Sequence, residues 1–350
     1  MTDWFDAARD DEITIMMVDP NNLGKNYGVL TGAILKSTSL SYGYDVETRT
    51  SGSISLLDGT NYVKNSWLRF HHTVKSDDYH NELGTYILTN PVESYTGEGY
   101  VRTYDMYSVL WGIKEDLYPG NFQIAAKTSS DDAFKMLCNS CKRDYVITGT
   151  NKYTYENAAI FEVGESYLNM LYSVASASNN RIDVDGHGNI TLSRYVQPNK
   201  ITPSWTLDVD DPRSIIIEGS ISMDSSIEDT PSRIIVTDTS GNNVILAYSD
   251  VPNNSEFSAS KRGYIKAELM SDLKPSSYAM AKAYSDAYAK ATVKTVEWKM
   301  STLYFPCKPG QTCVFIKNKE KHNCLIDTVD SLNLETMTMD ITLKELTEDV

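Results

Sequence analysis

The chain of 350 residues has little of the residue chemistry from which local catalytic and metal-binding motifs are built. It contains five cysteines and five histidines. It has no Gly-x-Ser-x-Gly elbow, phosphate-binding glycine-rich loop, dinucleotide fingerprint or His-Glu-x-x-His helix. These absences weigh against elbow-type hydrolases, nucleotide-binding enzymes and zinc proteases, so we expect neither catalysis nor a cofactor.

Positive charge and long apolar runs are also scarce. Lys and Arg number 32 against 47 Asp and Glu, a formal net charge of −15 that argues against binding nucleic acid by neutralising its phosphates. The early apolar run Ile13–Val18 is too short to cross a bilayer, and Met1–Glu12 lacks the features of a secretory signal. We therefore expect a soluble protein with reduced thiols rather than disulfides.

Tyrosine is abundant, with 23 Tyr against 8 Phe, and its ring is favoured on half-buried sheet faces and at protein interfaces. The segment Leu83–Leu110 predicts one long antiparallel hairpin. Its arms, Leu83–Thr89 and Gly99–Val109, are rich in β-formers, and breakers stand at Asn90-Pro91 and Thr96–Gly99. This composition favours a scaffold or an assembly protein.

The rest of the chain predicts two β regions separated by segments that contain helices. Strands are expected at Val29–Leu40, Tyr44–Leu57 and Ser66–Val74, and again at Ile215–Ile221, Ile234–Tyr248 with a turn at Ser240–Asn243, Val293–Met300, Thr312–Ile316, Cys324–Ser331 and Met337–Lys344. Helices are expected at Ala133–Cys141 after the capping residues Thr128–Asp132, after Gly164–Ser166 with a stripe of Leu168, Leu171, Tyr172 and Ala175, and from Pro275 to Ala291 with a stripe of Ala281, Tyr284, Tyr288 and Ala291. The hairpin Arg181–Tyr195 follows the second helix.

Three residue groups have the composition of possible metal sites, and a structural interpretation is favoured for each. Asp183-x-Asp185-x-His187-Gly188 begins like a calcium loop, but Arg194 stands where a closing Glu is needed, which favours a plain turn. Cys138-x-x-Cys141 lacks a second tight pair, because Cys307, Cys313 and Cys324 lie far along the chain, so these thiols are predicted to be core. His71 and His72 cannot easily ligate one ion, because adjacent strand residues point to opposite faces, so these two and His80 are predicted to be solvated or at an interface.

A hydrolase would need two carboxylates flanking a cleft. The pairs Glu93 with Glu98 and Asp116 with Glu115 are acids on predicted turns, and such pairs are expected by chance among 47 acids. A carbohydrate- or receptor-binding protein is the second alternative. It would use Trp4, Trp67, Trp111, Trp205 and tyrosines as stacking platforms.

Five stretches of the chain carry a resemblance to a known family. They are the hairpin Leu83–Leu110, Gly164–Leu168 with its helix and the following Asp-x-Asp-Gly-x-Gly-Asn hairpin, Pro231–Val236, Tyr278–Trp298 and Lys308–Thr312. These stretches resemble the tail hub, or baseplate hub, proteins of tailed bacteriophages and related contractile injection systems. The resemblance covers about Leu83 to the C-terminus, and Gln311 stands where that family usually has Asp.

The resemblance implies a β-rich α+β fold with two small antiparallel β-barrel domains per chain, joined by helical and α+β subdomains and assembled as a trimeric ring. The expected boundaries are 1–118, 119–212, 213–292 and 293–350. The implied function is a structural hub at the tail tip of a virion, assembled in the host cytoplasm. Its expected partners are two further copies of itself, the tail tube or a distal tail protein, and a spike, fibre or tip protein. DNA would pass its acidic channel without specific binding.

Overall fold

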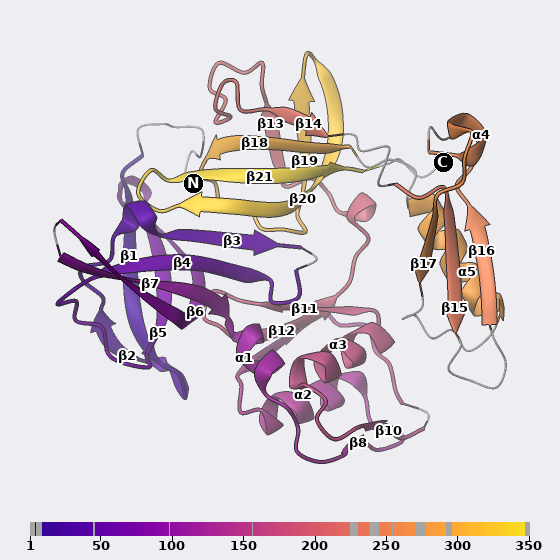
Figure 1. Cartoon of the computed structure of the whole chain (residues 1–350), viewed down its shortest axis with the longest axis horizontal. Coiled ribbons are helices and arrows are strands. Elements are labelled where there is room, and N and C mark those ends of the chain that lie inside the picture. The colour runs from indigo at the N-terminus through magenta and orange to yellow at the C-terminus, as the bar shows by residue number, and fades with distance from the viewer. Residues whose placement is uncertain are drawn as a thin grey trace. The chain divides into compact units, whose positions relative to one another are not determined.

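The structure is a computed structural model that describes residue 4 and residues 9–44, 46–97, 99–155, 157–224, 230–238, 245–253, 255, 257–270, 278–291 and 296–346. The chain divides into two compact units. The first unit comprises residues 1–197, 301–309 and 327–341, and the second comprises 198–300, 310–326 and 342–350. Strands predominate and helices are few (Figure 1), so the predicted β-rich α+β class is confirmed.

The first unit contains most of a large sheet that is mainly antiparallel. Its strands follow the order β2-β1-β5-β6-β7-β4-β3-β20, and each neighbouring pair is antiparallel. Among the described residues the pairing is an open path, so the two closed barrels stay a prediction. The bounds are β1 (Asp11–Asp19), β2 (Asn22–Val29), β3 (Ser39–Gly43), β4 (Thr50–Leu57), β5 (Trp67–Val74), β6 (Tyr79–Thr96), β7 (Gly99–Ser108) and β20 (Glu320–Asn333).

The predicted hairpin is confirmed as β6 and β7. The structure corrects one detail, because Asn90-Pro91 does not end the first arm. Instead the register shifts between Thr89 and Val92, with Asn90 at φ 47°, and the strand continues to Thr96. A bulge of this kind absorbs the missing N–H of proline without breaking the ribbon.

Of two strand predictions near the N-terminus, Val29–Leu40 is wrong and Tyr44–Leu57 is confirmed only from Thr50 onward. Val29–Leu40 is mostly a loop with a short 3-10 helix at Leu35–Ser37, and strand β4 begins only at Thr50. Gly32 at φ 85° and Arg49 at φ 62° place left-handed backbone inside the two predicted strands, and here it interrupts the extended conformation. Strand β1 was not predicted.

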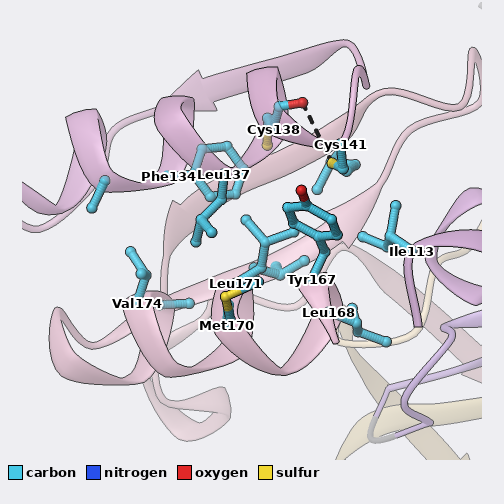
Figure 2. Packing of buried hydrophobic residues seen from close by; sticks show 14 of the residues in the cluster. Ile113, Phe134, Leu137, Cys138, Cys141, Tyr167, Leu168, Met170, Leu171 and Val174 are labelled. Atoms are coloured by element: carbon cyan, nitrogen blue, oxygen red, sulfur yellow. Dashed lines mark hydrogen bonds between the residues drawn. The ribbon is translucent and has the colours of Figure 1, made fainter. Parts of the chain in front are cut away.

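The second part of the first unit is a helical lobe, residues 109–194. Both helix starts are confirmed: the Ser129 hydroxyl accepts from the Asp132 amide, and the Ser166 hydroxyl accepts from the Asn169 amide. In Figure 2 the apolar side chains of α2 and α3 point toward one another and form the core of the lobe. The bounds are α1 (Val109–Glu115), β8 (Phe122–Ile124), α2 (Ser130–Ser140), β9 (Tyr145–Thr148), β10 (Ala159–Phe161), α3 (Tyr167–Ala177), β11 (Asn180–Val184) and β12 (Ile190–Arg194).

The second unit contains a three-stranded sheet in the order β16-β15-β17, with α5 packed on one face (Figure 1). The predicted strand Ile215–Ile221 is wrong, since the chain there forms turns and only a short strand follows. Ser240–Asn243, Pro275 and Val293 lie outside the described residues. The bounds are β13 (Trp205–Asp208), β14 (Ser222–Asp224), β15 (Arg233–Asp238), β16 (Ile245–Asp250), α4 (Ala259–Arg262), β17 (Ala267–Met270), α5 (Tyr278–Ala291) and β19 (Thr312–Lys317), while β18 (Glu297–Leu303), β20 and β21 (Thr338–Glu345) have residues in both units.

The buried face of α5 differs from the predicted stripe. Ala281 is buried as predicted, Tyr284 is half-buried and Tyr288 is exposed, whereas Ser285 and Ala289 complete the buried row. The side chain of Ala291 is not described. None of the described helices combines the length and apolarity that a membrane-spanning segment needs.

The alternation predicted for the last strand makes a stability test possible. Met339 and Ile341 of β21 are buried while Asp340 between them is exposed. We expect Ile341→Asp to cause unfolding or aggregation, because the substitution places an unpaired charge in a packed face. Asp340→Asn is the control, since an amide oxygen can still accept from the Ser301 hydroxyl. Circular dichroism and solubility unchanged in Ile341→Asp would contradict this register.

Candidate functional site

The helical lobe is fixed to the main sheet by a buried arginine. Arg69 of β5 donates from Nη2 to the carbonyl oxygens of Leu23, at 3.0 Å, and His187, at 2.8 Å, and from Nε to the Thr85 hydroxyl at 3.0 Å. Thr85 in turn donates to the Gly186 carbonyl. One guanidinium therefore joins β2, β6 and the turn between β11 and β12. Burial lowers the pKa of Arg69, and the carboxylates of Glu82 and Asp185 oppose this shift.

Gly186 is required for this close contact. A Cβ at Gly186 would stand 2.5 Å from the Cβ of Glu82 and 2.7 Å from its backbone oxygen. The turn is also closed internally, because Asp185 accepts from both the backbone and the side-chain amide of Asn189 at 2.8 Å. The Asp-x-Asp-Gly-x-Gly-Asn sequence is thus a docking turn. Asp183 accepts from the Val184 amide and lies 3.5 Å from Nε of Arg181.

Three further arginines join the same two parts of the first unit. Arg49 donates to the Ile182 carbonyl, Arg181 to the Tyr44 carbonyl and Arg143 to the Pro20 carbonyl, each at 3.2 Å. The Arg181 guanidinium also lies 3.7 Å from the centre of the Tyr44 ring, and Arg143 lies 4.8 Å from the Trp67 ring. Together with Arg69 these residues form what we call the arginine seam. Its four cations all bind backbone carbonyl oxygens across the contact.

A cavity of about 310 Å³ adjoins the seam. Its wall brings together β3, β6, the β11–β12 hairpin and residues 304–309, all within the first unit. Arg49, Arg181 and Lys308 line it together with Glu82, Asp183 and Asp185, so the charges of opposite sign balance. A balanced, mixed wall does not select for one class of ligand.

Every histidine of the chain lies within 4.0 Å of a carboxylate. Glu82 approaches both His71 and His187, and the other three pairs are His72 with Asp11, His80 with Asp78 and His322 with Glu345. His80 is exposed and His71 half-buried, but the expectation of solvated or interface histidines is wrong for His72, which is fully buried. Its Nε2 lies 2.7 Å from Asp11 Oδ1.

The Cys138 and Cys141 side chains belong to the core of the helical lobe, and Figure 2 shows the Cys141 thiol donating to the Cys138 carbonyl. Burial raises the pKa of Cys141 to about 11 and that of Cys138 further. Both are protonated near neutral pH, whereas a metal ligand must be a thiolate. Among the residues described, no three His, Cys, Asp or Glu side chains gather where they would hold a metal ion.

The residues of the two alternative functions are dispersed. Glu93 pairs with Arg102 at 3.2 Å, Glu98 lies outside the described residues, and Glu115 and Asp116 are exposed. Of the proposed stacking platforms, Trp67 is buried and Trp111 stacks on Tyr107. Trp4 contacts the rings of His72, Tyr79 and Tyr304, and Trp205 donates to Gln311.

The end of the β6–β7 hairpin is the most exposed apolar feature of the first unit's sheet. β5 pairs with β6 only as far as Tyr86, and β4 pairs with β7 only from Val101 onward, so the ribbon beyond them is two strands wide. Tyr95 is 71% exposed and Tyr100 51%, and their rings meet edge to face at 5.2 Å. An exposed apolar patch on a projecting ribbon is typical of a protein-binding surface.

The fold is shared with solved tail proteins. A tail protein from Neisseria meningitidis MC58 matches with a TM-score of 0.66 and 11% identity, over 96% of this chain and 96% of that chain. The 43 kDa tail protein of prophage MuSo2 from Shewanella oneidensis matches with a TM-score of 0.63 and 11% identity, over 95% and 98%. A prophage tail protein from Listeria monocytogenes EGD-e matches with a TM-score of 0.56 and 11% identity, over 97% and 95%.

No family model and no curated protein matches the sequence. At 11% identity the structural likeness establishes the fold and not the activity. The resemblance to tail hub proteins seen in the sequence is therefore confirmed as a shared fold, over nearly the whole chain rather than from Leu83 alone.

The arginine seam can be tested by a single substitution. We expect Arg69→Met to lower the free energy of unfolding by about 2–4 kcal/mol, because the Leu23 and His187 carbonyls lose their charged donor. Arg102→Met on the exposed hairpin is the matched control and should change it by less than about 0.5 kcal/mol. Equal stability of the two variants in urea unfolding would show that the seam contributes little.

His72 predicts a dependence of stability on pH. Burial lowers the pKa of His72, and its Nδ1 has no hydrogen-bond partner among the described residues, so the folded state disfavours the second proton. The unfolded chain therefore binds more protons, and stability should fall as the pH drops through about 6.5 toward the lowered value. Urea unfolding at pH 7.5 and 5.5 measures this slope. His72→Gln should flatten it, and an unchanged slope would contradict the assignment.

Proposed function

We propose that this chain is a structural tail hub protein. Three copies form a ring at the tail tip of a phage or a related injection particle, below the tail tube and above a spike, fibre or tip protein. The observation that carries the proposal is the shared fold over at least 95% of the chain with three solved tail proteins.

The proposed ring solves a symmetry problem. In this proposal residues 1–118 and 293–350 contribute two similar barrels per chain, with the helical subdomain 119–212 and the α+β subdomain 213–292 between them. Three copies then present six similar edges to a six-fold tube and three-fold symmetry to a spike. The net charge of −15 supports a DNA channel, since carboxylates along a lumen repel phosphates and prevent DNA from adhering.

The arginine seam supports a mechanical role. A part that transmits force between a tube and a spike needs its lobes fixed to one another, and four buried or half-buried guanidiniums bound to carbonyl oxygens supply such fixation. Charge-assisted bonds to the backbone do not depend on an opposing side chain. No chemical step, cofactor or bound metal is part of the proposal.

The oligomeric state of the purified full chain tests this function. Native mass spectrometry should give three times the chain mass of 39.2 kDa at micromolar concentration. A monomer at every concentration, with no incorporation into particles, would contradict the hub. Trimers that bind glycans but are absent from the tail axis would favour the receptor-binding alternative. Peptidoglycan cleavage lost on replacing one carboxylate would favour a hydrolase.

A further inference from the structure

We propose that the tip of the β6–β7 hairpin in one copy docks on the open face of the β16-β15-β17 sheet in the next copy. This inference rests on the proposed function, because it names the contact through which the ring would close. Each of the two surfaces binds a second copy of this chain.

The first surface is the hairpin tip, defined here as residues 92–95 with 100–102. Directly paired residues of an antiparallel ribbon share a face, so Tyr95 lies with Tyr100 and Glu93 with Arg102 on the same side. The Glu93–Arg102 ion pair closes at 3.2 Å beside the two rings. This face presents two tyrosines beside a carboxylate and a guanidinium that already satisfy each other.

The second surface is the face of the three-stranded sheet that α5 does not cover. Ile234, Val236 and Ala247 face α5 and are buried with Ala281 and Ala289. Their neighbours along each strand point the other way. Tyr248, Ile235 and Leu269 are register partners and form one row across this open face, and Leu246 lies beside the row. Leu269 is 62% exposed, and Tyr248 and Leu246 are also exposed.

The open face also has its charges paired. Arg233 donates to both oxygens of Asp250, at 2.6 and 3.0 Å, and its guanidinium lies 4.5 Å from the centre of the Tyr248 ring. The arrangement repeats that of the hairpin tip, in which aromatic rings adjoin a closed ion pair. Neither surface therefore needs an opposing charge from its partner.

A second copy of this chain can meet these two surfaces despite its like charge. Two copies of net charge −15 repel each other over most of their surfaces. The tip and the open face expose apolar groups among internally neutralised charges, so they can meet without adding like-charge contacts. In a ring, each copy contacts one neighbour through one patch and the other neighbour through a different patch. The hairpin tip and the open face are two different patches, as such a head-to-tail interface requires.

Disulfide trapping in the full-length chain tests the contact. The variants are Tyr95→Cys, Leu269→Cys and the double variant, each oxidised with copper phenanthroline and analysed by peptide mass spectrometry. We expect a 95–269 link between copies in the mixture of the two single variants, and covalent trimers in the double variant. Val163→Cys in place of Leu269→Cys is the matched control, since Val163 is 65% exposed and lies outside both surfaces; it should give no link to position 95.

Native mass spectrometry of the same samples separates the two proposals. Trimers without a 95–269 link would overturn the docking inference and leave the hub function standing. Links of 95 to 95 or of 269 to 269 alone would overturn it in favour of a symmetric contact between like surfaces. Monomers throughout would contradict the hub and the docking together. As an independent measure, Tyr95→Ser should raise the concentration at which the trimer dissociates about tenfold or more.

Discussion

The first unit depends on one kind of interaction, a guanidinium that donates to backbone carbonyl oxygens across a contact. Arg69 is the clearest case, because a single buried side chain binds β2, β6 and the docking turn. Arg49, Arg143 and Arg181 repeat the pattern in both directions between the sheet and the helical lobe. The chain has more acidic than basic residues, and four of its arginines bind backbone oxygens inside the first unit. These four cations therefore contribute less to the surface charge.

The contact between the sheet and the helical lobe explains the short turn motif that resembles a calcium loop. Gly186 allows the backbone to approach Glu82, and Asp185 closes the turn on Asn189. The same residue types would serve an ion or a docking turn, and only the surroundings distinguish the two. Here the backbone carbonyls of Gly186 and His187 face Thr85 and Arg69, which accounts for the motif by packing alone.

The sequence allowed much of the secondary structure to be predicted, because local signals decided it. The Ser129 and Ser166 caps, the β6–β7 hairpin and the buried Met339 and Ile341 on either side of exposed Asp340 were all predictable from spacing, although Thr342 is buried as well. The prediction of a strand at Val29–Leu40 failed because left-handed backbone at Gly32 interrupts a run of β-formers. The arginine seam was not predictable, since Arg69 reads as the polar side of an alternating strand and its acceptors lie 46 and 118 residues away. The burial of His72 was missed because its partner Asp11 lies on the unpredicted strand β1.

The central claim is that the chain is an axial hub and not a peripheral binding protein. Electron cryomicroscopy of particles that carry this chain with a small fused label measures its copy number and position directly. The account predicts three labels around the tail axis at the tip, between the tube and the spike or fibre. Labels at any other number, or placed away from the axis on the fibres, would contradict it.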